Sequence, residues 1–292
     1  AGLGIKNPNI RVISSEYLKL EGKAFSAVKN WALWADYVCK NYSVDSFRYY
    51  LALNSPEDKD SDFTWRDYIY IHNNDLVGDL AGFVNKVITF ARKNYAKRIP
   101  NGNLDEKLKN DILNLYFDLE EKIEDGYFKE SLIDIMDLCK RGDKYFDDSK
   151  VWDLLGKDPL ECKNVNYNCI QIIINLSNLL YPFIPSTCEK IRSSLGLGEG
   201  IWSFTEKKEG LIKECEVLFN KIDKKRATEE IIRLILLKDT KALKQNKLKL
   251  GVITINLEKV KEYYTGEYAK FIIGLAIDYK KELKKMFKET FA

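Results

Sequence analysis

The longest regular pattern in the chain is a helical one that runs from Thr64 to Arg98. In TWRDYIYIHNNDLVGDLAGFVNKVITFARKNYAKR, apolar side chains recur every three or four residues and so share one stripe of a helix. Further helical patterns follow at about 104–124, 128–141, 159–181 and 186–195. Amphipathic helices joined by short connections pack side by side, so the sequence predicts a mainly α protein built on an antiparallel helix bundle. The first stripe comprises Ile69, Leu76, Leu80, Phe83, Val87 and Phe90.

The residues before this pattern predict a smaller mixed unit. IRVISS (10–15) and YLKLEG (17–22) read as two short extended pieces, and Glu21-Gly22 has the residue types that suit a tight turn. Asn30 is then expected to cap a helix over WALWADYVCK, and Ser43 a second helix over VDSFRYYLALN, before SPEDKDSD breaks the pattern. We expect this strand-hairpin unit to complete a sheet begun upstream of Ala1.

The composition is that of a globular protein. The 292 residues are 45% apolar and 31% charged, and the longest apolar runs fall short of the ~18 to 20 residues that span a bilayer, so no membrane passage is expected. The six cysteines are widely spaced without a CxxC pair, and His72 is the only histidine. These counts argue against a zinc site, a disulfide framework and a histidine-dependent triad. They predict a cytoplasmic protein without a metal site.

Charge sets the last quarter of the chain apart. From Lys225 to Ala292 there are 16 Lys/Arg against 9 Asp/Glu, a net +7, whereas the preceding residues carry −4. Two interpretations stay open: the tail supplies a non-specific, salt-sensitive RNA footprint, or it packs against the bundle or a partner. We therefore divide the chain into residues 1–62, 63–224 and a basic extension, 225–292. The apolar stripe that favours packing comprises Ile231, Ile232, Ile235, Leu236 and Leu243.

Seven phrases taken together resemble the C-terminal half of the methionyl-tRNA synthetases. They occur in family order over about residues 10–224 and are RVISSEYLKLEGKAFS, NWALW, VDSFRYYLALNSPEDKDSDFTW, NNDLVGDLAGFVNKVITF, DKYFDDSKVW, LLYPFIP and VLFNKID. The resemblance implies an upstream Rossmann-like catalytic fold with a histidine-rich signature, then a signature loop and stem-contact fold, then a helical anticodon-binding domain. Family enzymes activate methionine with ATP and transfer it to tRNA. Because the histidine signature is absent from these residues, we expect this chain to hold no cofactor and not to aminoacylate alone.

The signature loop of the family reads Lys-(Met or Phe)-Ser-(Lys or another residue)-Ser-Arg and places ammonium groups against the triphosphate. Aligned on EYLKLEG and NWALW, this chain has Ala24 at the first lysine, Ala27 at the second basic position and Val28 at the second serine. Losing one such transition-state donor typically costs ~3 to 4 kcal/mol. The sequence therefore predicts a loop without its family chemistry, or a plain hairpin turn before a helix. The loop residues are Lys23, Ala24, Phe25, Ser26, Ala27, Val28 and Lys29, of which Phe25 and Ser26 agree with the family and Lys29 stands at the arginine.

The anticodon-reading signatures have also changed. The family reads CAU by stacking and base-edge hydrogen bonds, with a helix signature Leu-x-Asn-x-x-x-Arg. Here LAGFVNK puts Gly82 at the asparagine and Lys86 at the arginine, with Asn85 nearby. Gly82 offers no amide, and Lys86 keeps the charge but loses the planar bidentate geometry.

In the second signature, DKYFDDSKVW, Asp143 stands where asparagine is usual, Val151 replaces the proline and Trp152 is retained. An indole stacked on a base is worth ~1 to 3 kcal/mol, so Trp152 is a candidate for the RNA contact. The alternative is an aromatic side chain packed between helices.

A basic edge continues along the same helix as Lys86. We expect Arg92, Lys93, Lys97 and Arg98 either to contact phosphates or to form a solvated helix face. Trp31, Trp34, Tyr49 and Tyr50 are assigned to the core of the first unit.

Three functional hypotheses follow. The chain is the tRNA-binding part of a methionine-tRNA ligase joined to an upstream catalytic fold, a non-catalytic paralogue that binds RNA as a regulator, or a protein-interaction module that has lost RNA binding.

Overall fold

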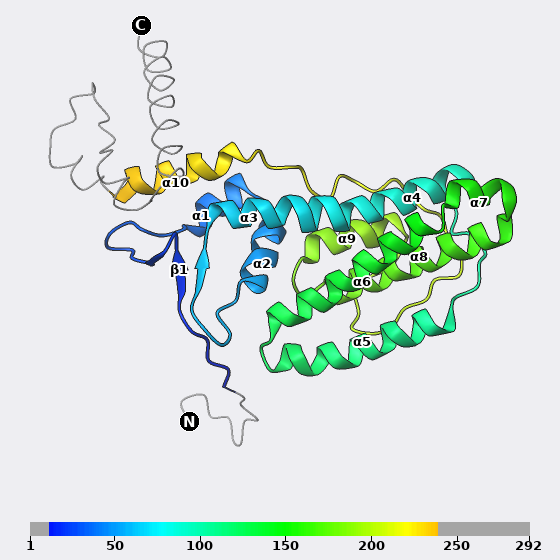
Figure 1. Cartoon of the computed structure of the whole chain (residues 1–292), viewed down its shortest axis with the longest axis horizontal. Helices are drawn as coiled ribbons and strands as arrows, with labels where there is room; N and C mark the ends of the chain where they lie inside the picture. The colour runs from blue at the N-terminus through cyan, green and yellow to red at the C-terminus, as the bar shows by residue number, and fades with distance from the viewer. Residues whose placement is uncertain (1–11, 239–292) are drawn as a thin grey trace, which may run out of the picture.

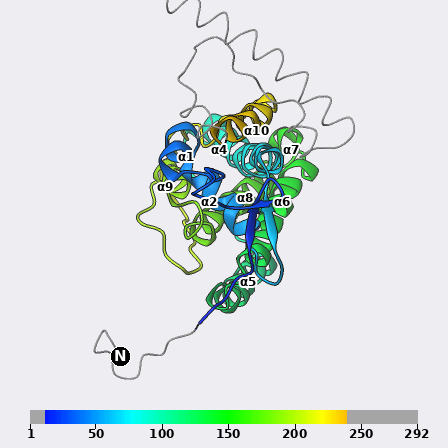
Figure 2. The same ribbon diagram turned by 90° about the vertical axis from the view of Figure 1, so that its left-hand side faces the viewer.

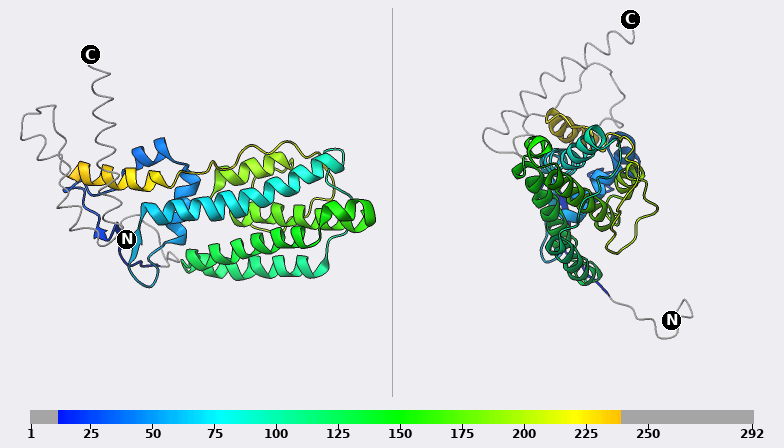
Figure 3. Two further views of the ribbon diagram at one scale, coloured as in Figure 1. Left: turned by 45° about the horizontal axis from the view of Figure 1, so that its top comes forward. Right: turned by 90° about the vertical axis from the view of Figure 1, so that its right-hand side faces the viewer.

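The computed structural model describes residues 12–238, and within them helices dominate. In chain order the elements are β1 (Leu18–Leu20), β2 (Lys23–Ala24), α1 (Ala35–Asn41), α2 (Val44–Leu53), β3 (Ser61–Phe63), α3 (Trp65–Ile71), η1 (His72–Ala81), α4 (Gly82–Asn94), α5 (Glu106–Glu124), α6 (Phe128–Asp148), α7 (Val151–Lys157), α8 (Pro159–Leu179), α9 (Pro185–Ser194) and α10 (Lys225–Lys238). The bundle formed by α4, α5, α6, α8 and α9 is seen from the side in the left panel of Figure 3 and nearly end-on in Figure 2. The prediction of a mainly α protein with a helix bundle is confirmed.

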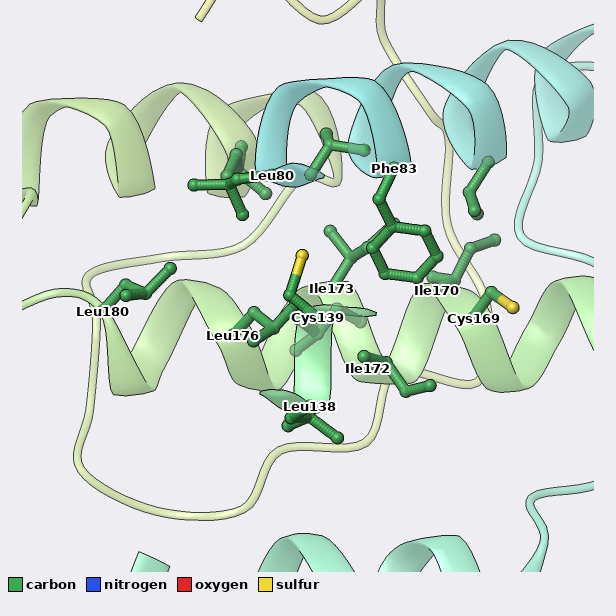
Figure 4. Packing of buried hydrophobic residues seen from close by; sticks show 14 of the residues in the cluster. Leu80, Phe83, Leu138, Cys139, Cys169, Ile170, Ile172, Ile173, Leu176 and Leu180 are labelled. Atoms are coloured by element: carbon green, nitrogen blue, oxygen red, sulfur yellow. The ribbon is translucent and has the colours of Figure 1, made fainter. Parts of the chain in front are cut away.

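The core of the bundle is built around α8, which lies between its neighbours. Every residue from Val165 to Leu179 is buried, and α8 packs against α4, α5, α6, α7 and α9. Figure 4 shows Phe83 of α4 meeting Ile170, Ile172 and Ile173 of α8, with Cys139 of α6 beside them. The predicted stripe of the Thr64–Arg98 helix faces this core from Leu76 onward, because Leu76, Leu80, Phe83 and Val87 are all fully buried in it. Ile69, at the start of the stripe, is buried in a separate core of the first unit.

One long helix runs through the molecule, as Figure 1 shows for α3 and α4. Its middle section, η1, is a π-helix of ten residues, which is wider than an α-helix and is rare at this length. The helix starts in the first unit, where the Thr64 side chain accepts a hydrogen bond from the backbone N–H of Asp67. It ends in the bundle at Asn94.

The first unit contains a three-stranded sheet in the order β2-β1-β3. The turn between β1 and β2 is formed by Glu21 and Gly22, whose φ angles of 48° and 76° are left-handed, so the predicted hairpin turn is confirmed. β3 pairs with β1 in parallel. A second apolar core lies against this sheet and includes Leu20, Trp31, Phe47, Phe63, Trp65 and Tyr68.

Several local predictions were wrong. Residues 12–15 form no strand, the second strand of the hairpin is Lys23–Ala24, and β3 lies in a stretch we read as a break. The first helix begins at Ala35 rather than after Asn30, because Asn30 has a φ of 53° and its side-chain oxygen accepts a hydrogen bond from Trp34 Nε1. Trp34 is 46% exposed and does not belong to the core, and Tyr49 is buried in the core of the bundle rather than in that of the first unit. Helix α7 was also missed.

The tail expected to start at residue 225 begins with α10, which is helical as predicted as far as Lys238. Ala227, Ile231 and Leu234 of α10 join the second core, so this helix packs against the first unit rather than standing apart (Figure 1). The remaining expectations for the tail, including Leu243, fall outside the described residues. Within 12–238, no helix is both long and apolar enough to cross a membrane.

Candidate nucleic-acid interface

Gly82, Asn85 and Lys86 lie together on the first two turns of α4. A Cβ placed on Gly82 would meet only the Val77 carbonyl oxygen, at 3.8 Å, which is an ordinary contact. Packing therefore leaves room for a side chain there, and the family's asparagine amide is lost without a steric reason. Asn85 is exposed, and its side-chain oxygen accepts a hydrogen bond from the Thr89 hydroxyl at 3.3 Å.

Lys86 is held by two carboxylates of α6. Its ammonium lies 2.7 Å from Asp143 Oδ1 and 2.8 Å from both oxygens of Asp147. Burial opposes the charged form, but the two carboxylates outweigh it and raise the pKa of Lys86 above its ordinary value. The Lys86 ammonium, which we expected to face RNA, is therefore paired with carboxylates of the protein itself. The sequence indicated Asp143, at a position where the family has asparagine. Asp147 was not predicted, although the two acids stand four residues apart on one helix face.

Trp152 is displayed at the start of α7, just after Lys150 turns the chain with a φ of 46°. Its side chain is 56% exposed, whereas Phe146 beneath it is buried and meets the indole edge-on at a centroid distance of 6.4 Å. Lys86 approaches the same phenyl ring, at 6.0 Å from its centroid. The structure thus brings Lys86 and Trp152 to one place around Phe146. Val151, at the family's proline, is fully buried.

The basic edge of α4 is only partly available. Arg92 is half-buried and lies 3.8 Å from Glu214, whereas Lys93, Lys97 and Arg98 are exposed. The chain turns after α4 through Ala96 and Lys97, both with left-handed φ angles of 50° and 60°. Arg98 then pairs with Leu211 in an isolated bridge. Three of the four predicted basic side chains therefore face solvent.

The signature-loop residues form a tight, closed turn at the edge of the sheet. Ser26 and Trp31 exchange both backbone hydrogen bonds at 2.9 Å, and Asn30 N–H donates to Ala27 O at 3.1 Å. The Lys23 ammonium lies over the Trp31 ring, at 5.4 Å from its centroid. Phe25 is 39% and Val28 78% exposed, and Ala24, Ala27 and Lys29 are also exposed. The loop presents a mostly apolar surface.

The turn that precedes the loop contains Glu21, an acid that the sequence indicated only as part of a turn. Glu21 accepts a hydrogen bond from the Trp65 backbone N–H at 2.9 Å. Burial, with repulsion from Asp62 and Asp67, raises the pKa of Glu21 to about 7, although the Trp65 N–H opposes the shift. The Glu21-Gly22 pair predicted the turn, but the contacts that bury the Glu21 carboxyl come from β3 and α3, which are distant in sequence.

Two protein families match consecutive stretches that make up most of the chain. Residues 1–88 match the family described as tRNA synthetases class I (M), and residues 98–233 match the anticodon binding domain of methionyl tRNA ligase. The chain belongs to the methionyl-tRNA synthetase family. The second match extends into α10, so the first residues of the predicted extension lie within the family's anticodon-binding domain.

Individual relatives agree with this assignment. The chain is 36% identical over 233 residues to a methionine-tRNA ligase of Bacillus cereus (strain B4264), and 38% identical over 234 residues to one of Alkaliphilus oremlandii (strain OhILAs). Each alignment covers 80% of this chain but 43% of the relative, so the chain spans less than half the length of these ligases.

The fold is also that of solved family structures. The apo form of Mycobacterium tuberculosis methionyl-tRNA synthetase superposes with a TM-score of 0.65 at 18% identity, over 75% of this chain and 45% of the other. The methionyl-adenylate-bound form superposes with a TM-score of 0.63 over 70% and 43%.

Proposed function

We propose that this chain is the tRNA-docking portion of a methionyl-tRNA synthetase-like protein, that it binds the anticodon arm of tRNA, and that it does not aminoacylate tRNA on its own. The observation that carries the proposal is the exposed indole of Trp152 beside the α4 surface, in a domain of the anticodon-binding family. An exposed aromatic side chain offers any unpaired base a stacking surface.

The proposed mode of binding depends more on stacking than on base-edge hydrogen bonds. Gly82 has no side chain to donate or accept, and the Lys86 ammonium is held by Asp143 and Asp147. Backbone phosphates would be contacted by the exposed Lys93, Lys97 and Arg98, which supply charge without reading sequence. Affinity should therefore fall as salt is raised.

The same proposal assigns methionine activation to another part of the protein. Ala24 and Ala27 replace the ammonium groups that the family's loop directs at the triphosphate. ATP and methionine chemistry would thus belong to an upstream Rossmann-like fold, with this chain as its tRNA-binding partner in the cytoplasm.

The test is a titration of the chain with tRNA at low salt, comparing the wild type with Trp152→Ala. Loss of one stacking contact is worth ~1 to 3 kcal/mol, so we expect the dissociation constant to rise by roughly ten-fold. Phe117→Ala is the matched control, because Phe117 is 74% exposed on α5 and should leave the affinity unchanged. No affinity for any tRNA, or equal losses in both variants, would contradict the proposal.

A second candidate is a paralogue without catalysis, which binds RNA or proteins as a regulator. The exposed Ala24, Ala27 and Val28, in place of the two basic residues and the second serine of the family's loop, favour it. Methionine-dependent exchange of pyrophosphate into ATP, measured on the full-length protein, separates the two. Exchange supports a ligase, and its absence supports the paralogue. A pull-down that returns RNA but no protein would contradict a role as a protein-interaction module.

A further inference from the structure

The first unit and the bundle are connected by more than the long helix α3–η1–α4. The return segment, residues 203–223, leads from the bundle back to α10. Side-chain amides of α8 hold its first half: Gln171 and the backbone of Lys207 form hydrogen bonds of 3.0 and 2.9 Å, and Asn175 and the backbone of Thr205 form two of 2.9 Å. These side-chain amides satisfy the backbone N–H and C=O groups of Thr205 and Lys207, which a neighbouring strand would satisfy in a sheet.

The second half of the return segment is held by two adjacent residues of the π-helix η1. Asn73 Nδ2 donates to Ile222 O at 2.8 Å, and Ile222 N–H donates to Asn73 Oδ1 at 2.9 Å. His72 Nε2 lies 2.9 Å from Asn220 O, so this ring nitrogen carries the proton and donates it. Both backbone polar groups of Ile222 are therefore satisfied by one side chain.

Helix α10 starts immediately beyond this clamp. The Asp223 side chain accepts a hydrogen bond from the Lys225 N–H at 2.9 Å, and α10 begins at Lys225. With so few residues between them, the direction of the chain at Ile222 decides where α10 begins. Ile222 itself packs against the second core.

On the first unit, α10 is anchored by a buried carboxylate. Glu230 is 1% exposed, and its Oε1 accepts hydrogen bonds from the hydroxyls of Tyr37 at 2.5 Å and Tyr42 at 2.6 Å. Arg226 and Arg233 lie 3.6 and 3.9 Å from this carboxylate. Because the Glu230 carboxylate is buried, it must meet the Tyr37 and Tyr42 hydroxyls, and it does so in only one register of α10.

We propose that Asn73 is a positioning residue for tRNA binding: by clamping Ile222 it holds α10 on the first unit. Together with α2, which packs against α6 and α9, it so fixes the orientation of the first unit relative to the anticodon-reading bundle. This inference rests on the proposed tRNA docking. A tRNA long enough to reach both units is sensitive to their orientation, whereas an isolated anticodon stem-loop touches only the bundle.

The test uses the full chain and the variant Asn73→Asp, which keeps the shape of the side chain but replaces the Nδ2 donor by a second acceptor facing Ile222 O. Hydrogen exchange of the backbone amides in α10 should become roughly ten-fold faster, with α8 unchanged. Affinity for a complete tRNA should fall by roughly ten-fold, while affinity for an isolated anticodon stem-loop stays within about two-fold of the wild type. Asn74→Asp, which adds the same charge at an exposed neighbour, is the control.

Each outcome decides a separate point. Unchanged exchange in α10 would show that Asn73 does not hold this helix, and equal acceleration in α8 would show a general loss of stability; either overturns the proposal. Equal weakening of both RNAs overturns the positioning role. If the wild type binds neither RNA, the proposed function fails, while the exchange measurement still decides whether the clamp exists. Asn73→Ser, which removes the contacts without adding charge, should reproduce the exchange result.

Discussion

Single residues decide how much of the family's chemistry this chain retains. The pairing of Lys86 with Asp143 and Asp147 turns an RNA-facing cation into part of a helix-to-helix contact. The exposure of Trp152 leaves its indole open to solvent, as the proposed stacking on a base requires. The sequence shows which residue types are present, but the partner of Lys86 depends on two helices meeting across 61 residues of chain.

Glu21 makes the stability of the first unit dependent on pH. Its pKa is raised from 4.5 to about 7, so the folded protein keeps a proton that the unfolded chain releases between these values. The free energy of unfolding should therefore be highest below pH 4.5 as far as Glu21 contributes, fall as pH rises to 7, and level off above it. We expect a contribution of about 1 to 2 kcal/mol after solvent screening.

The check is urea unfolding of wild type and Glu21→Gln at a series of pH values. Glutamine resembles the protonated acid and cannot titrate, so the stability of Glu21→Gln relative to the wild type should rise by about 1 to 2 kcal/mol across this window. Glu16→Gln, at an exposed position, should run parallel to the wild type. A parallel curve for Glu21→Gln would show that the carboxyl does not titrate there.

At the level of elements, helix crossings depend on small residues that periodicity does not reveal. Gly142 of α6 lies where α4 and α8 approach, and a Cβ there would come within 2.8 Å of Phe83 Cζ and 3.2 Å of Ile172 Cδ1. Both neighbours are buried in the core shown in Figure 4, so neither can move away cheaply.

We therefore expect Gly142→Ala to lower the free energy of unfolding by about 1 to 3 kcal/mol through overpacking, despite the better helix propensity of alanine. Gly156→Ala in α7 is the matched control, since a Cβ there meets nothing within 4 Å. It should be neutral or stabilising by up to about 1 kcal/mol. Thermal unfolding of the two variants tests the contrast, which fails if Gly142→Ala is as stable as Gly156→Ala.

Elements were predictable where their signals were local. The helices of the bundle followed from apolar periodicity, and the Ser43 cap is confirmed by its hydrogen bond from the Ser46 N–H at 3.3 Å. β3 was missed because Ser61–Phe63 becomes a strand only by pairing with Leu18–Leu20. The start of α1 was misplaced because the Asn30 side chain bonds an indole instead of capping.

At the scale of the whole molecule, two apolar cores are joined by the long helix, by α2, which packs against α6 and α9, and by the return segment that leads to α10. Tyr42 holds α10 on the first unit, because its hydroxyl donates to the buried Glu230 and its ring packs against Trp65 at a centroid distance of 5.0 Å. Burial, followed by the bond to Glu230, raises the pKa of Tyr42 well above the ordinary value. The hydroxyl therefore stays protonated and keeps donating throughout the physiological range.

Tyr42→Phe removes this donor while keeping the ring. Because a hydrogen bond to a charged group contributes about 1.5 to 3 kcal/mol, we expect a loss of that size in the stability of the first unit, with faster amide exchange in α10. Tyr70→Phe, at a hydroxyl on α3 that is 64% exposed, is the control. Equal stability of the two variants would show that Glu230 does not depend on Tyr42.

The sequence alone determined the family, the helix bundle, the hairpin turn and the replacement of the loop's charged residues, because these are written in neighbouring residues and in a period of three to four. Only the tertiary structure decided that Lys86 is paired with Asp143 and Asp147, that Trp152 is exposed and that α10 belongs to the first unit. These three features depend on contacts between residues that are distant in the sequence. Such contacts form only when the helices have packed, so neighbouring residues do not reveal them.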